Sequence, residues 1–202
     1  MKSLIFNNQM SAFEALVASI KLCTICKDKL PLGARPVFQI HPDAKILIAG
    51  HAPGRKVHNS GIPFDDASGQ RLREWLGMSI ETFYNPKVVA ILPMGFCYPG
   101  TGKNGDMAPL IECEATWRAQ LLDQLPHLKM TLVLGQYAQN YHFGNTKQSL
   151  TQRVKTWQQN ESNEVPLPHP SPRNNIWLSK NRWFEKDLIP KLKLRVADIL
   201  AP

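Results

Sequence analysis

The stretch LIAGHAPGRKVHNSGIPF, residues 47–64, indicates both a fold class and a functional loop, because an apolar run passes directly into a sharply bent segment. The run AKILIAG, residues 44–50, is continuously apolar and ends at a glycine, which predicts a central parallel strand covered on both faces. The connection to Phe64 then concentrates glycines, prolines, two histidines and two cations. A loop that only joined two elements would not need so many polar side chains, so the segment predicts a functional loop.

Strands alternate with helices along the rest of the chain. Further strands are expected at residues 87–95, 131–135 and 165–168. Helical spacing is found at residues 11–22, 69–78, 116–128, 150–159 and 181–199, the last interrupted at Pro190. This alternation predicts a three-layer α/β/α sandwich with a short, mostly parallel central sheet. We expect one domain over residues 1–202, with the N-terminal helix and CxxC segment 1–40 packed on it.

The composition suits a globular protein with a polyanionic partner. Of the 202 residues, 43% are hydrophobic, and the longest apolar runs fall well short of the roughly 18 residues of a membrane helix. The N-terminal MKSLIFNNQMSAF has an apolar patch too short for a secretory signal, so we expect a cytoplasmic protein, and a monomer with no membrane partner. The net charge of +8 favours nucleic acid as a partner, although solubility alone would also explain it.

Four cysteines, Cys23, Cys26, Cys97 and Cys113, form a candidate metal site. The two-residue gap in CTIC allows both thiolates to face one metal centre. Soft sulfur ligands suit Zn or a [4Fe–4S] cluster. The alternative is two pairs of unrelated buried thiols, because free cysteine is among the most buried residue types.

Loops that follow the strands of a parallel sheet meet at one edge, where ligands bind. In the first such loop, Gly50, Pro53 and Gly54 are expected to bend the backbone and to leave amide groups facing a ligand. The turn GIP then precedes Phe64, whose ring could serve as a stacking plate or could belong to the core. This loop therefore predicts one wall of a binding pocket.

The last loop, PHPSPRNN, offers a titratable ring and phosphate-binding groups. His169 lies between two prolines that fix its backbone direction, and it could act chemically or only cap a strand. Ser171 can reach a phosphate oxygen, and Arg173 could bind a phosphate, enter a base stack or stay solvated. The loop therefore predicts the second wall of the pocket.

Three other patterns predict less. GTGKNGD lacks the spacing of a phosphate-binding loop, with Asn104 in place of Ser or Thr. The adjacent Asp65 and Asp66 are expected to cap the following helix rather than to act as an acid–base pair, and Ser68 is another possible cap. A third hypothesis, an amidase or other hydrolase that uses His169, is not supported, because the sequence has no G-x-S-x-G nucleophile elbow.

Taken together, GHAPG…GIPFDDASGQRL resembles the first motif of the uracil-DNA glycosylase superfamily. Its iron–sulfur branch, family 4, has approximately G-E-x-P-G, then G-x-P-F, then a small residue and Gly before a Leu-rich helix. HPSPRN resembles the second motif, which begins the loop that enters DNA. The cysteines are similar to those of the branch as well, with CxxC near the N-terminus and a step of about sixteen residues from Cys97 to Cys113. The resemblance covers roughly residues 20–195.

The resemblance implies a uracil-DNA glycosylase-like fold and an enzyme that flips a damaged base, uracil by default, out of single- or double-stranded DNA and hydrolyses its N-glycosidic bond. His169 would hydrogen-bond the base O2 as negative charge develops there. The base-binding residues would be Gly50, Ala52, Pro53, Gly54 and Phe64. The DNA-binding residues would be Ser171 on the flanking phosphate, Arg173 as the wedge that fills the vacated stack, and Asn174. The four cysteines would hold a structural [4Fe–4S] cluster, with Zn as the alternative.

Three positions depart from the family pattern. His51 replaces an acidic residue that positions or activates water; as a catalytic residue it could orient water as a neutral base, but it carries no fixed negative charge. Pro93 replaces an Asn that reads the uracil edge, so discrimination between bases is in question. His58 aligns with an Asp and could be a covalent nucleophile, although a solvent-facing loop histidine is the simpler expectation. These departures support a second hypothesis, a non-catalytic module that binds nucleic acid or a nucleotide.

Overall fold

The computed structural model describes residues 10–103, 105–144, 146–160 and 162–201. The N-terminal apolar patch and Asn104, both considered above from sequence, lie outside these ranges. No helix in the described ranges has both the length and the apolar character needed to cross a membrane.

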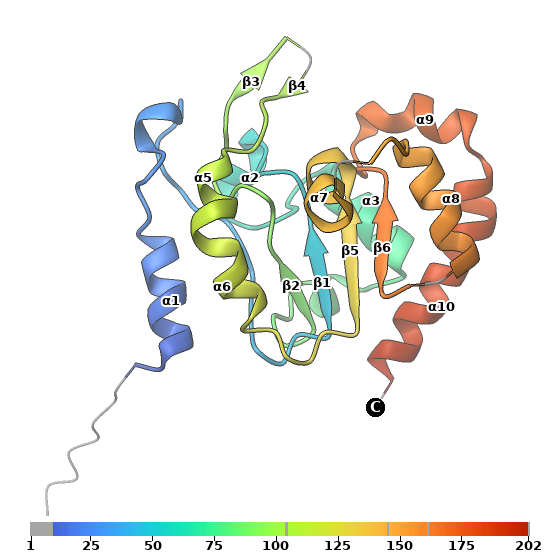
Figure 1. The fold of residues 1–202 in the computed structure, drawn as a ribbon, viewed down its shortest axis with the longest axis horizontal. Coiled ribbons are helices and arrows are strands. Elements are labelled where there is room, and N and C mark those ends of the chain that lie inside the picture. The colour runs from blue at the N-terminus through green and yellow to red at the C-terminus, as the bar shows by residue number, and fades with distance from the viewer. Residues whose placement is uncertain (1–9, 104, 145, 161, 202) are drawn as a thin grey trace, which may run out of the picture.

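A four-stranded parallel sheet forms the centre of the molecule (Figure 1). Strand β1 (Ile46–Ala49) lies between β2 (Val89–Ile91) and β5 (Met130–Leu134), and β5 pairs with β6 (Glu164–Leu167). The order is β2-β1-β5-β6, and every pairing is parallel. The four predicted strands are therefore confirmed; β1 and β2 are shorter than predicted, and β5 and β6 each begin one residue earlier.

Alternating side chains of β1 pack against helices on both faces of the sheet. Ile46 and Ile48 belong to a large core with the helices that cover one face, chiefly α3 (Ala67–Leu76), α8 (Leu150–Asn160) and α10 (Ile189–Leu200). Leu47 packs on the other face with Ile20 of α1 (Ala12–Lys21) and Leu121 of α6 (Ala119–Leu122). Because successive residues of a strand point to opposite faces, this arrangement confirms the predicted three-layer sandwich.

Shorter elements complete the described part of the chain. They are η1 (Lys27–Lys29), α2 (Arg55–Ser60), α4 (Ile80–Phe83), β3 (Thr101–Gly102), β4 (Gly105–Asp106), α5 (Ile111–Cys113), η2 (Glu114–Arg118), α7 (Gly135–Phe143), η3 (Pro172–Asn174), α9 (Asn175–Lys180) and η4 (Phe184–Leu188).

Three elements differ from the sequence predictions. The first loop contains the short helix α2, and the second forms the antiparallel hairpin β3–β4, which projects beyond the sheet (Figure 1). Pro190 does not interrupt the last helix but lies in the first turn of α10, directly after the π-helical turn η4. The helical backbone continues into Pro190 from η4, and the wider π-helical turn before the proline accommodates the hydrogen bond that its missing N–H cannot make.

A buried arginine lies beneath the end of β2. Arg118, in η2, is 1% exposed and donates through Nη1 to the Leu92 carbonyl oxygen at 3.1 Å and, more weakly, to that of Pro93 at 3.5 Å. Its Nη2 lies 3.0 Å from His142 Nε2, and His142 Nδ1 lies 2.9 Å from a carboxylate oxygen of Glu164. This network ties α7 and β6 to the backbone that leads into the binding edge of the sheet.

Candidate active site

A cavity of about 580 Å³ opens at the carboxyl ends of the four parallel strands. Gly50 follows β1, Pro93 follows β2, Gly135 follows β5 and His169 follows β6, and all four line it. In the order β2-β1-β5-β6, the chain continues from β1 to β2 on one side and later to β5 on the other. The cavity therefore lies at the topological switch point of the sheet, where ligands bind in folds of this kind. The two loops that were expected to meet do border one cleft.

Nearly all residues singled out from the sequence for catalysis, base binding or DNA binding line this cavity. They are Gly50, His51, Ala52, Pro53, Gly54, Phe64, His169, Ser171, Arg173 and Asn174. His58 is the exception. It lies in α2, is 7% exposed and packs against Tyr98, with 6.0 Å between the two ring centroids. The expectation of a solvent-facing loop histidine was wrong, and the structure does not bring this ring to the cavity wall.

Phe64 is held in an unusual backbone conformation. Its φ of 57° makes it the one non-glycine residue with positive φ in the described ranges. A Cβ added at Gly69 would overlap the Phe64 carbonyl oxygen, so only glycine permits this close approach. The ring packs edge-on against Phe83, with 6.2 Å between the ring centroids, and its tip approaches Gly50, where an added Cβ would be 3.6 Å from Phe64 Cζ. Phe64 therefore packs against the core and also forms a rigid wall of the cavity.

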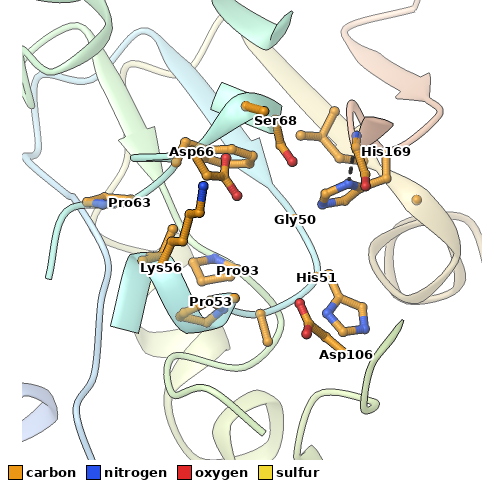
Figure 2. A pocket seen from close by; sticks show the side chains of 18 of the residues that line it. Gly50, His51, Pro53, Lys56, Pro63, Asp66, Ser68, Pro93, Asp106 and His169 are labelled. Carbon is orange, nitrogen blue, oxygen red and sulfur yellow. Dashed lines mark hydrogen bonds between the residues drawn. The ribbon is translucent and has the colours of Figure 1, made fainter. Parts of the chain in front are cut away.

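The imidazole of His169 points into the cavity in a defined tautomer (Figure 2). Its Nδ1 accepts the Ser171 backbone N–H at 3.2 Å, and its carbonyl oxygen accepts from Asn174 Nδ2 at 2.7 Å. Burial, with a smaller effect of His51, lowers the pKa of His169 to about 4. The ring is therefore neutral at pH 7 and carries its proton on Nε2, which is left free to donate to a ligand.

His51 lies between an aromatic edge and a carboxylate. Its ring packs edge-on against Tyr137 at 5.0 Å, and Asp106 lies beside it (Figure 2). Burial lowers the pKa of His51, and the negative charge of Asp106 opposes this shift. His51 is thus neutral at pH 7 and can accept a proton.

The structure adds polar residues that the sequence analysis missed or placed elsewhere. Lys56, Ser68, Asp106 and Tyr137 line the cavity. Ser68 is not the cap of α3, because Asp66 is, accepting the Gly69 N–H at 3.0 Å; the Ser68 hydroxyl instead faces the cavity (Figure 2). One signal could have found Asp106: it ends the second post-strand loop, which was considered only as a phosphate-binding loop.

The four cysteines gather near the N-terminal segment. Cys26 and Cys97 share an apolar cluster with Leu30, and each of the three buried thiols interacts electrostatically with other thiols of the set. Burial raises the pKa of Cys26 and of Cys97 to about 11, and no disulfide joins any of the four. Within the described ranges, no three His, Cys, Asp or Glu side chains are placed to hold a metal ion. The thiol chemistry thus fits a soft metal, while the side-chain arrangement is not that of a formed metal centre.

Comparison with known families agrees with the geometry. The sequence profile described as "Uracil DNA glycosylase superfamily" matches residues 37–193, well over half of the chain. The match includes all four strands of the sheet and every loop that lines the cavity. The chain belongs to the uracil DNA glycosylase superfamily.

Proposed function

We propose that the protein is a DNA glycosylase that hydrolyses the N-glycosidic bond of uracil or another damaged base flipped out of DNA. One observation carries the proposal: neutral His169 and the Phe64 ring, from opposite ends of the matched region, line the same cavity. An enzyme that acts on a base must take it out of the stack and hold it between an aromatic face and hydrogen-bonding groups. Phe64 supplies the face, and His169 Nε2 supplies the donor.

The reaction assigns a task to each histidine. The bond between sugar C1′ and the base nitrogen breaks, and its electron pair leaves with the base, whose oxygen His169 Nε2–H stabilises. Water attacks C1′ and passes a proton to neutral His51, and that proton is later returned to the departing base. Both rings must be neutral for these tasks, which agrees with the lowered pKa of each.

The rim of the cavity suits the DNA backbone. Ser171 and Arg173 lie on the His169 loop, and Arg71 Nη1 donates to the Ser171 carbonyl oxygen at 3.2 Å, which holds this loop against α3. Hydroxyl and guanidinium groups are common phosphate ligands in protein–DNA complexes. We propose that this loop grips the strand beside the flipped nucleotide.

Base specificity is a matter for experiment, because Pro93 lines the cavity where the resemblance places an Asn whose amide would hydrogen-bond the uracil edge. The amide of Gln136 lines the cavity after β5, whereas on the wall beside Pro93 the polar side chains are those of Ser68 and Lys56. Neither reproduces the paired donor and acceptor of an Asn amide. We therefore propose weaker discrimination between uracil and other damaged bases than an amide reader would give.

The second candidate is a non-catalytic module that binds nucleic acid or a nucleotide in the same cavity. The absence of a carboxylate at position 51 favours it, since the first motif then lacks a charged group for water activation. Such a module would retain the stacking wall of Phe64 and the phosphate contacts of Ser171. It would bind damaged DNA without releasing a base.

Base release separates the two candidates. Oligonucleotides containing a single uracil, hypoxanthine, xanthine or mismatched thymine are incubated with the protein, treated with alkali and analysed for strand breaks. A glycosylase yields breaks that His169→Ala abolishes and that His127→Ala, an exposed histidine at the other edge of the sheet, leaves unchanged. Binding without abasic product on every substrate supports the module.

We also propose that Cys23, Cys26, Cys97 and Cys113 bind a structural [4Fe–4S] cluster, with Zn as the alternative. The preference of soft metals for sulfur and the electrostatic interactions among the four thiols support this assignment, and a metal would have to displace the protons of the three buried thiols, whose pKa values burial raises. A cluster would link the CxxC segment before η1 to the segment after β2 and to α5, and the Lys29–Glu112 ion pair already connects η1 to α5. Absorbance near ~400 nm with four irons per chain supports the cluster, one zinc per chain supports the alternative, and metal-free protein that remains folded contradicts both.

A further inference from the structure

We propose that Asp106, carried by the β3–β4 hairpin, is a catalytic residue that supplies the negative charge missing at position 51. The inference rests on the proposed glycosylase function and assigns a role to a residue outside the two sequence motifs. A sugar that loses its base develops positive charge, and a fixed carboxylate beside it lowers the barrier. The cavity must therefore obtain such a charge from another part of the chain.

The hairpin brings this carboxylate to the first loop. Asp106 ends β4 and lines the cavity, and its Oδ2 would lie 3.3 Å from a Cβ added at Gly54. Figure 2 shows its side chain beside that of His51. The charge of Asp106 opposes the effect of burial on the pKa of both His51 and His169; at His169 the charge of Asp66 acts in the same direction and more strongly, whereas at His51 the opposing charge is that of Asp106.

The carboxylate is held in place by its own hairpin. Thr101 Oγ1 donates to Asp106 Oδ1 at 3.1 Å, and the hydroxyl of fully buried Tyr98 pairs with Thr101. A Cβ at Gly105 would overlap the guanidinium of Arg173, so the hairpin also packs against the His169 loop. Oδ1 is thereby engaged, and Oδ2 is the oxygen turned toward Gly54.

The other carboxylate that lines the cavity has a different task. Asp66 caps α3 through its hydrogen bond from Gly69 N–H, and it lies across the cavity from His51 (Figure 2). His51 and His169 are both neutral at pH 7 and offer no fixed negative charge. Each of the two carboxylates has one oxygen engaged in a hydrogen bond, so position separates them: Asp106 lies next to His51, the histidine that takes the water proton, and this assigns the role to Asp106.

The test compares chemistry with binding in one set of variants. Asp106→Asn should slow single-turnover base release by about 100-fold or more, while the Kd for the same oligonucleotide stays equal or falls, since a charge that repels phosphate is lost. Asp106→Glu should recover part of the rate. Asp65→Asn, an equal charge change at the residue before Asp66 and outside the cavity lining, should leave the rate unchanged.

Thr101 tests the positioning of the carboxylate. Thr101→Val removes the donor to Oδ1 and should slow base release by about tenfold, while Thr101→Ser should restore it. Circular dichroism and thermal melting verify that each variant is folded.

Two results would overturn the proposal while the glycosylase function stands: Asp106→Asn within threefold of the wild-type rate, or rate and affinity lost in parallel, which would make Asp106 only a DNA contact. If the wild-type protein releases no base from any substrate, the proposed function itself fails and Asp106 has no catalytic role.

Discussion

The backbone N–H of Ser171 donates to His169 Nδ1 at 3.2 Å, and this bond fixes the imidazole as its Nε2–H tautomer. The ring therefore presents a neutral donor to the cavity. Removing one preorganised donor to a developing anion typically costs 10²–10³-fold in rate. We predict that His169→Ala lowers single-turnover base release by roughly this factor, with little change in Kd for DNA. A variant that retains the wild-type rate would contradict the assigned role.

The low pKa of His169 also makes stability depend on pH. The unfolded chain binds a proton to this ring below its ordinary value of 6.5, whereas the folded protein does so only near 4. Between these values the unfolded state binds more protons, so the free energy of unfolding falls as pH falls from about 6.5 to about 4. His51, His58 and His142 have lowered pKa values and act in the same direction.

Denaturant titrations across this pH range measure the effect. His169→Gln should reduce the slope of unfolding free energy against pH, because one of the contributing groups is removed. An identical slope for the wild type and His169→Gln would show that the ring is not buried in its neutral form.

Gly69 should tolerate no side chain. A Cβ there would overlap the carbonyl oxygen of Phe64, whose backbone is already in the left-handed region. We predict that Gly69→Ala destabilises the fold by about 3 kcal/mol and displaces the Phe64 ring. Gly102→Ala is the matched control, since the nearest atom to its added Cβ is 3.7 Å away. Chemical denaturation measures both variants, and equal stabilities would show that the Phe64 turn adapts easily.

Arg118 links the binding edge of the sheet to α7. Arg118→Met fills similar space but leaves the Leu92 carbonyl oxygen without this donor and breaks the contact with His142. A buried polar group that loses its partner costs about 1–3 kcal/mol, and we expect a loss of stability in that range. Arg182→Met, at an exposed position, is the control. Base release should also slow if the backbone at Pro93 shifts; an unchanged melting temperature would count against the network.

Arg173 should contribute to DNA affinity through charge. Neutralising one phosphate contact lowers the slope of log K against log salt by about one on duplex DNA. We predict that Arg173→Ala shows this change together with weaker binding at low salt. Lys87→Ala removes an equal charge just before β2, at the amino ends of the strands and opposite the cavity, and should keep the wild-type slope. A wild-type slope for Arg173→Ala would place that side chain away from the phosphates.

The sequence alone determined the layered fold and most of the cavity wall. Continuous apolar runs such as AKILIAG define strands locally, and a strand buried on both faces requires helices on each side. Loops after parallel strands must share one edge, so the GHAPG and HPSPRN segments could be placed together before any coordinates. These conclusions depend on local pattern and on a general rule of sheet geometry.

Only the tertiary structure decided which polar side chains complete the site. Asp106 meets His51 because a hairpin folds back over the first loop, and no local pattern encodes the approach of two segments so far apart in the chain. His58 shows the converse: it lies in the motif loop by sequence, but the turn of α2 buries it against Tyr98. Side-chain direction and burial follow from packing across the whole molecule, and these set the charge available for chemistry.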